Sequence, residues 1–272
     1  MTRTGYRLGA AARADGHRLH VHERLGSTNA EALAVARAGE TGPLWIAARV
    51  QEAGRGRRGN AWASLPGNLA ASVLWPAAGL DPERLATLGF VAGVALIEAI
   101  EAACGTAPVC DPAAADRSFR LKWPNDVLCG NAKLAGILLE AETLPGGRRT
   151  LVIGFGVNVA AVPVAFADRA VSLQGAGYAT DAETVLELLA DRLAGAARAW
   201  DGGRGFNGIR GRWLARAAGL GQPVAVRIGT ETVRGRFEEI DEGGRLVMSA
   251  PDGARRLVTA GEVHFGTAAT AA

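Results

Sequence analysis

The sequence is poor in cysteine and in net charge, and both shortages exclude classes of protein. Its three cysteines, Cys104, Cys110 and Cys129, are an odd number without C-x-x-C spacing. That pattern argues against a disulfide framework and a zinc site, and it favours a reducing compartment. The 30 basic and 27 acidic residues leave a net charge of only +3, which is too weak to indicate nucleic-acid binding by itself.

Long apolar runs are also missing. Residues 1–16 carry Arg3, Arg7 and Arg13 but no apolar core of a secretory signal. The most apolar helical stretch, residues 88–100, is shorter than a membrane span and is flanked by charge. We therefore expect a cytoplasmic protein without membrane association. Hydrophobic residues make up 49% of the chain, enough for a sizeable core.

Patterning divides the 272 residues into two parts. Strands are predicted at 19–25, 44–50, 69–75, 120–123, 133–141 and 149–159, with a turn at 126–131 and helices at 83–103, 185–200 and 206–217. The capping boxes Thr28/Glu31 and Thr180/Glu183 predict two helix starts. From Gln222 onward, short alternating runs separated by glycine turns are typical of a small β-barrel. We predict domains at 1–220 and 221–266, followed by a frayed tail at 267–272.

A single lysine stands in the segment Leu121-Lys122-Trp123-Pro124-Asn125-Asp126. Pro124 favours an extended backbone at Trp123, which places Lys122 near a strand end. Gly136 interrupts the next apolar strand, and such a glycine often marks the close approach of a ligand or another backbone. A lone cation beside a strand opened by glycine suits an anionic substrate. Taken alone, the segment is more typical of a surface lysine on an ordinary loop, but it does not stand alone.

A glycine- and arginine-rich segment follows the strand at 44–50. Gly54, Gly56 and Gly59 spell G-x-G-x-x-G, a dinucleotide-binding fingerprint. We reject that interpretation because residues 60–68 show no apolar helix, so the crossover that the motif requires is missing. Arg55 and Arg57 offer forked, permanently charged donors, and we expect the loop to be mobile until an anion orders it. The alternative is a flexible basic surface loop.

Two further segments offer polar groups. Ser27, Thr28 and Asn29 lie at a predicted helix N-terminus, where they either only cap the helix or also bind a polar ligand. Gly154 and Gly156 share one face of their strand and would leave room for a flat group. Asn158, on that same face, can both donate and accept hydrogen bonds, as reading an adenine edge requires. The alternative is a glycine-rich core strand that ends in a turn asparagine.

Together these segments resemble the biotin–protein ligases. The matching motifs, in the family's order, are Gly26-Ser27-Thr28-Asn29, Gln51 to Gly59, Lys122 to Asp126, Lys133 to Leu138, and Gly154 to Asn158. The resemblance implies an α+β fold with a mixed sheet packed by helices, like that of class II synthetases. It also implies a small C-terminal SH3-like β-barrel.

The resemblance assigns roles to residues of several motifs. Lys122 would contact the carboxylate and phosphate, and Lys122 and Arg57 would be catalytic. Trp62 and Asn158, with Lys122, would meet the nucleotide. No metal ligand is assigned. The biotin-binding set would be Ser27, Thr28, Asn29, Gln51, Gly54, Arg55, Gly56, Arg57, Lys122 and Gly136.

The implied reaction uses biotin, ATP and Mg²⁺ to form biotinyl-5'-AMP, and then transfers biotin to a lysine of a biotin carboxyl carrier domain. No His or nucleophile motif is present, and adenylation requires neither. Asp126 is only a weak candidate for the base in the transfer. Asn60-Ala61 departs from the family, in which some members carry Arg-Lys there. The first 18 residues are too few for a winged helix, so we expect no operator DNA binding. An edge strand could pair two copies as a homodimer.

Two rival functions remain. A lipoate–protein ligase or octanoyl transferase shares the catalytic fold, although the R-G-R loop and K-W-P-N-D favour biotin. A non-catalytic nucleic-acid-binding protein would use Arg55, Arg57 and Arg58, but the modest charge and the lack of interleaved aromatics disfavour it. ATP–pyrophosphate exchange with biotin, with lipoate or with neither discriminates among these functions.

Overall fold

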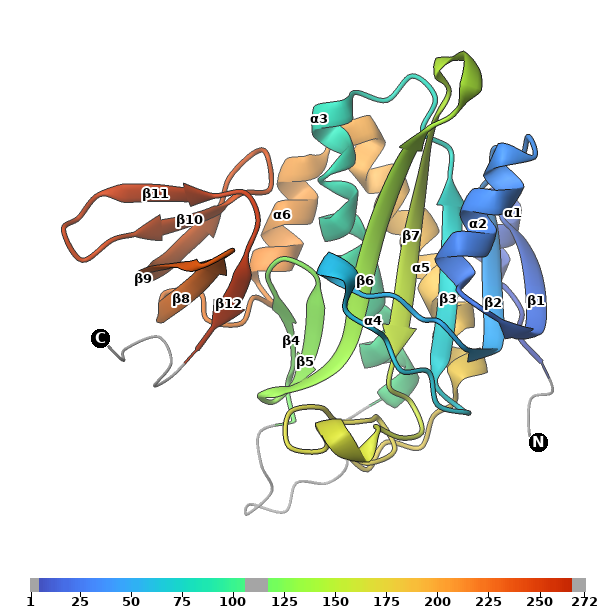
Figure 1. Cartoon of the computed structure of the whole chain (residues 1–272), viewed down its shortest axis with the longest axis horizontal. Helices are drawn as coiled ribbons and strands as arrows, with labels where there is room; N and C mark the ends of the chain where they lie inside the picture. The colour runs from blue at the N-terminus through green and yellow to red at the C-terminus, as the bar shows by residue number, and fades with distance from the viewer. Residues whose placement is uncertain (1–4, 106–116, 266–272) are drawn as a thin grey trace.

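A seven-stranded mixed sheet forms the centre of the protein (Figure 1). The structure, a computed structural model, describes residues 5–105 and 117–265. The sheet order is β1-β2-β3-β7-β6-β5-β4, with β1 and β2 parallel and the other pairs antiparallel. The predicted mixed sheet is therefore confirmed. Its strands are β1 (Arg18–Leu25), β2 (Leu44–Gln51), β3 (Leu69–Trp75), β4 (Phe119–Lys122), β5 (Asp126–Cys129), β6 (Ala132–Thr143) and β7 (Arg149–Val157).

Helices cover the two faces of this sheet unequally. The larger core lies between the sheet and helices α4 (Leu88–Cys104), α5 (Ala182–Trp200) and α6 (Phe206–Leu214), with the short α1 (Ala10–Ala14) against α5 and α3 (Pro82–Leu85) preceding α4. On the opposite face, α2 (Thr28–Arg37) packs on β2, β3 and β7 (Figure 1). Successive side chains of β2 point to opposite faces of the sheet, so Trp45 packs in the larger hydrophobic cluster and Ile46 packs in the cluster under α2. The rest of the face beside α2 remains open for a pocket.

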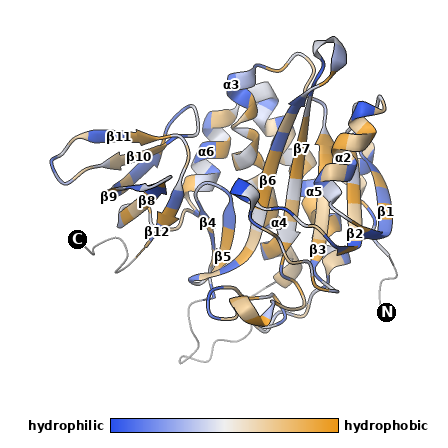
Figure 2. Cartoon of the chain, viewed as in Figure 1, coloured by the Kyte–Doolittle hydropathy of each residue, from blue (hydrophilic) through white to orange (hydrophobic). Residues whose placement is uncertain are grey.

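One helical segment is apolar enough to resemble a membrane span. Pro82–Cys104 is the single candidate by length and composition among the described residues, and 72% of its most apolar window is buried in the fold. The helix predicted at 83–103 corresponds to this segment, which the structure divides into α3 and α4. Figure 2 shows the hydrophobic residues of the large domain gathered in this helix and the central strands. Its apolarity is that of a core helix enclosed by the sheet, α5 and α6.

The C-terminal segment forms a second, antiparallel sheet of order β11-β10-β9-β8-β12. Its strands are β8 (Pro223–Ile228), β9 (Glu231–Ile240), β10 (Leu246–Ser249), β11 (Arg255–Val258) and β12 (Glu262–His264). The expected barrel does not close within the described residues, since no ladder joins β11 to β12. β11 buries only Val258 and leaves Leu257 47% exposed, so it offers little apolar surface on which a barrel could close. The predicted tail at 267–272 lies outside the described residues.

The hairpin that carries Lys122 corrects the sequence-based interpretation. Residues 126–131 were expected to form a turn, but Asp126–Cys129 is strand β5, and Lys122 pairs with Asp126 in the β4–β5 ladder. The chain reverses already at Trp123–Asn125, and the next reversal uses only Gly130 and Asn131. A strand of four residues between two tight turns is too short to show a hydrophobic period.

Candidate active site

The pocket lies where β6 and β7 are not covered by α2. Gly136 faces Gly156 and Leu138 faces Gly154 across these two strands, and all four residues line a cavity of about 190 Å³. Side chains at the same positions would fill this floor, so the glycines create the depth of the pocket. This pair of strands thus supplies the opening that the sequence predicted.

The indole of Trp62 lies directly on the glycine floor. A Cβ atom added to Gly156 would be 2.4 Å from Cε2 of Trp62, and one added to Gly136 would be 3.4 Å from Cζ3. Lys133 Nζ is 5.7 Å from the centroid of the same ring. Of the two glycines over which a flat group was expected, Gly156 therefore lies under the Trp62 indole, which is part of the pocket wall, whereas Gly154 faces the Asn29 side chain.

The arginine segment closes on itself beside Trp62. The Trp62 N–H donates to Gly54 O at 2.9 Å, and the Gly56 N–H donates to Asn60 O at 2.7 Å. A bridge also joins Arg55 to Ala61. Only the 3-10 turn Arg57–Gly59 interrupts the loop before β3, which runs antiparallel to β2. The rejection of a dinucleotide fingerprint is confirmed, because no crossover helix follows the motif.

The N-terminus of α2 brings three polar side chains, Ser27, Thr28 and Asn29, to one end of the pocket. Ser27 caps the helix, accepting from the Ala30 N–H at 3.4 Å. Gln51 Oε1 accepts from the Thr28 N–H at 2.8 Å and from Thr28 Oγ1 at 3.1 Å. The fully buried Ser72 of β3 has its hydroxyl 2.7 Å from Thr28 Oγ1 and 2.5 Å from Asn29 Oδ1. These groups are immobilised before any ligand binds.

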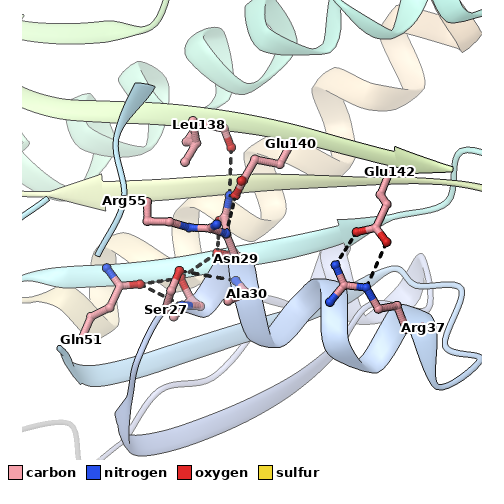
Figure 3. Close-up of polar contacts among 11 residues, drawn as sticks. Ser27, Asn29, Ala30, Arg37, Gln51, Arg55, Leu138, Glu140 and Glu142 are labelled. Carbon is pink, nitrogen blue, oxygen red and sulfur yellow. Dashed lines mark hydrogen bonds and ion pairs between the residues drawn. The ribbon is translucent and has the colours of Figure 1, made fainter. Parts of the chain in front are cut away.

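Glu140 of β6 connects this polar end to the arginine loop (Figure 3). Its Oε2 accepts from Asn29 Nδ2 at 2.7 Å and from Arg55 Nη2 at 3.0 Å. Asn29 Nδ2 also lies 3.4 Å from Leu138 O. Charge-assisted hydrogen bonds of this kind are stronger than neutral ones. One carboxylate oxygen therefore holds residues that lie more than twenty positions apart in the sequence.

Lys122 occupies the other end of the pocket. Burial lowers the pKa of its ammonium group, against the opposing influence of Asp126 and Glu262. Within the described residues it takes part in no ion pair, because the Asp126 carboxylate is 2.7 Å from Lys133 Nζ instead. Its Nζ lies 5.7 Å from the centroid of the Phe265 ring. An anion in the pocket would supply the charge partner that the fold leaves open.

Arg57 provides a second cation at this end. Its Nη1 donates to Asn125 Oδ1 at 3.1 Å, and Asn125 Nδ2 donates to Ile137 O at 2.8 Å. Burial and the neighbouring Arg58 lower the Arg57 pKa. Asn125 therefore anchors the guanidinium to β6 without neutralising it.

The small C-terminal sheet contributes one wall. Gly261, Glu262 and Val263, at the start of β12, line the same pocket as Ser27. Glu262 is paired with Arg227 at 2.5 Å, which holds the carboxylate within its own sheet. Both lysines of the whole sequence, Lys122 and Lys133, also line this pocket.

Most of the predicted site residues converge. The pocket is lined by Ser27, Thr28, Asn29, Gln51, Arg55, Gly56, Arg57, Trp62, Lys122 and Gly136. Gly54 and Asn158 do not line it: Gly54 closes the loop through its carbonyl, and Asn158 lies just beyond β7 and is only 5% exposed. The roles assigned to all these residues remain predictions.

Two residues that organise the site, Ser72 and Glu140, were not singled out from the sequence, and Asn125 was noted within the Lys122–Asp126 motif without its role as the partner of Arg57. Ser72 interrupts the apolar strand Leu69–Trp75, and Glu140 ends the apolar run after Lys133. A polar residue inside a buried strand needs a hydrogen-bond partner, and that rule could have marked both. Asn125 carries no such signal, because its partners come from two distant segments.

Comparison with known proteins agrees with this geometry. Residues 22–158 match the biotin/lipoate A/B protein ligase family, and residues 219–266 match the biotin protein ligase C-terminal domain. The chain is 45% identical, over 89% of its length and 98% of the relative, to the biotin–[acetyl-CoA-carboxylase] ligase of Paracoccus denitrificans. It is 32% identical to the Mycobacterium tuberculosis protein of the same name, over 90% of this chain and 88% of the relative.

A solved structure supports the same grouping. The biotin protein ligase from Aquifex aeolicus, in complex with biotin and ATP, superposes with a TM-score of 0.72 and 25% identity. The match covers 91% of this chain and 97% of that chain. The pocket, the two matched domains and these relatives together place the chain among the biotin protein ligases of the biotin/lipoate A/B protein ligase family.

Proposed function

We propose that this protein attaches biotin to a lysine of a biotin carboxyl carrier domain through biotinyl-5'-AMP. In the first step a biotin carboxylate oxygen bonds to the α-phosphorus of ATP and pyrophosphate leaves. In the second step the lysine amine attacks the acyl carbon, AMP leaves and the amine loses a proton. The name of the Paracoccus relative and the biotin and ATP in the Aquifex structure support this assignment.

The observation that carries the proposal is the division of the pocket into two ends. Hydroxyl and amide groups at the α2 N-terminus suit a polar ring, and Lys122 and Arg57 at the other end suit anions. An acyl-adenylate has the same two ends, a ureido ring and a phosphate, joined by an apolar chain. The lipoyl and octanoyl groups of the rival enzymes have no ureido ring for the first end to bind.

Adenylation needs charge neutralisation rather than an enzyme nucleophile. A carboxylate and a triphosphate repel each other, and preorganised cations lower the energy of their encounter. Lys122 is suited to this task because burial removes it from water and no ion pair within the described residues neutralises it. Arg57, fixed by Asn125, would act beside it as the second catalytic cation.

Mg²⁺ is proposed to enter with the ATP phosphates. No group of three His, Cys, Asp or Glu side chains in the described part of the chain could hold a metal ion. Mg²⁺ commonly keeps several waters and is bound through one or two carboxylates together with substrate phosphates. In this mode the ATP phosphates and waters would supply most of the contacts to the ion.

The second step requires deprotonation of the acceptor lysine, whose ordinary pKa is about 10.4. Asp126 remains the nearest candidate base, but its carboxylate is already engaged by Lys133.

Trp62 and Asn158 are proposed to meet the adenosine. The domain boundary near residue 220, the cytoplasmic compartment and homodimer formation also stay proposals.

ATP–pyrophosphate exchange tests the proposed function. We expect exchange with biotin and none with lipoate, with octanoate or without an acid. Adding a biotin carrier domain should then give a labelled lysine, detected by streptavidin blotting and by mass. Exchange with lipoate or octanoate but not with biotin would indicate the rival lipoate or octanoyl activity. Absence of exchange with every acid would refute the proposed ligase activity.

A further inference from the structure

Glu140 is a charged residue that accepts hydrogen bonds from two residues predicted to bind biotin, Asn29 and Arg55. It does not line the pocket, and its side chain is 27% exposed. Its Oε2 accepts from Asn29 on α2 and from Arg55 on the loop (Figure 3). The position of this carboxylate therefore determines how two elements that are not neighbours in sequence meet over the sheet.

The hydrogen-bond inventory of Asn29 fixes the orientation of its amide. Nδ2 has two protons, and its two acceptors are Glu140 Oε2 at 2.7 Å and Leu138 O at 3.4 Å. Oδ1 lies 2.5 Å from the Ser72 hydroxyl. Rotating the amide by 180° would place Oδ1 against two acceptors, which is unfavourable. The capacity left on this amide is a lone pair of Oδ1, so toward a ligand Asn29 can only accept.

We propose that Glu140 is a positioning residue for ligand choice: it fixes Asn29 as an acceptor for a ligand N–H and holds Arg55 at the same end of the pocket. The inference rests on the proposed function. A ureido ring offers N–H groups to this acceptor, whereas the dithiolane ring of lipoate and the chain end of octanoate offer none. A site built to bond a polar group rejects analogues that lack it.

The experiment compares Glu140→Ala and Glu140→Gln with Glu142→Gln. Glu142 is the matched control, since it stands two residues along β6 and pairs with Arg37 of α2 at 2.6 Å without contacting Asn29 or Arg55. Biotin binding is measured by calorimetry without ATP. We expect Glu140→Ala to weaken it about 10- to 100-fold, the range for hydrogen bonds to charged groups. Glu142→Gln should stay within about twofold of wild type.

Two further readouts separate positioning from general damage. The effect of Glu140→Ala should be smaller in an Asn29→Ala background than in wild type, because contacting residues that act together are not additive. Desthiobiotin, which keeps the ureido ring but lacks the sulfur ring, should lose affinity as biotin does. ATP affinity and the melting temperature are followed in every variant.

Several results would overturn the inference. The first is that Glu140→Ala binds biotin as tightly as Glu142→Gln does. The second is that Glu140→Ala lowers biotin affinity as much in the Asn29→Ala background as in wild type. The third is that Glu140→Ala lowers the affinity for biotin but not for desthiobiotin. If Glu140→Ala does not fold, Glu140→Gln replaces it, and affinity within twofold of the control is then the overturning outcome. Wild-type protein that does not bind biotin would instead refute the proposed function.

Discussion

Lys122 stands at the end of β4 with its ammonium group withdrawn from bulk water and facing a pocket. In the proposed mechanism Lys122 is the principal cation for the carboxylate and the phosphate of the substrates, and replacement with alanine removes it. By analogy with the loss of one oxyanion-hole donor, Lys122→Ala should lower the adenylation rate about 100-fold or more. Pyrophosphate exchange measures the rate.

Arg120→Ala is the control for this variant. It removes one positive charge from the same strand at an exposed position outside the pocket lining. Exchange within about twofold of wild type is expected for it. Near-wild-type biotinyl-AMP formation by Lys122→Ala would remove Lys122 from the mechanism.

Single residues also show the limit of reading motifs. The two capping boxes placed the caps at Thr28 and Thr180, but the capping residues are Ser27 and Asp181. Thr28 is drawn into tertiary bonds with Gln51 and Ser72, which no local pattern contains. Asp181 accepts from the Thr184 N–H at 2.7 Å, and a carboxylate is a stronger acceptor there than a threonine hydroxyl.

At the scale of elements, the β6–β7 pair provides a matched test of the glycine floor. Gly156→Ala places a Cβ 2.4 Å from the Trp62 indole, whereas Gly136→Ala places one at 3.4 Å, an ordinary contact. Gly156→Ala should therefore displace Trp62 or cost about 1–3 kcal/mol of stability through overpacking. Urea unfolding and tryptophan fluorescence measure both effects, and equal behaviour of the two variants would contradict the packing described for Trp62.

His17, just before β1, gives the sheet a pH-dependent anchor. Its Nδ1 accepts from Trp45 Nε1–H of β2 at 2.9 Å, and burial lowers its pKa below the ordinary 6.5. The unfolded chain therefore binds more protons than the folded one between the lowered pKa and 6.5. Its contribution to stability is complete above pH 6.5 and is lost as pH falls through that window.

His17→Asn tests this anchor, because the asparagine side-chain oxygen can accept from Trp45 without titrating. The free energy of unfolding, measured with urea from pH 5 to 8, should depend less on pH in the variant than in wild type. Parallel pH profiles for the two proteins would show that His17 does not titrate differently on folding.

Most of the elements of the large domain were predictable because their period or their boundaries are strong. β3 has the predicted bounds, and the glycine-stopped helix at 185–200 extends only three residues further at its start. The short elements α1 and β5 were missed because five and four residues contain too little of a period to read.

At the scale of the whole molecule, Trp123 joins the two sheets. Its buried indole donates to Gly244 O of the small sheet at 3.2 Å, while the next residues turn toward β5. Trp123→Phe removes that bond but keeps an aromatic ring, so the docking of the small sheet should weaken by about 0.5–1.5 kcal/mol. Limited proteolysis should cut between residues 218 and 223 faster than in wild type, and unchanged cleavage would contradict the role of this contact.

The types of residue in the five motifs and the order of the motifs predicted that they would converge on one pocket. They did not predict which other parts of the chain form the walls of that pocket. The β12 wall at Glu262 lies more than 230 residues from Ser27, and its place depends on how the small sheet docks. The small antiparallel β domain was predictable from strand spacing, but strand spacing does not determine whether its edge strands pair, and no ladder joins β11 to β12 within the described residues.

The location of both lysines in the pocket has a chemical consequence. A mixed anhydride that escapes an adenylating enzyme reacts with neutral amines, and guanidinium groups, with pKa values above about 12, stay protonated. Apart from Lys122 and Lys133, every basic side chain of the sequence is arginine or histidine. Self-acylation of side-chain amines is thus confined to Lys122 and Lys133, so every acylated side chain found by peptide mapping of the spent enzyme would mark a reaction at the pocket, distinguishable from acylation of the terminal α-amine.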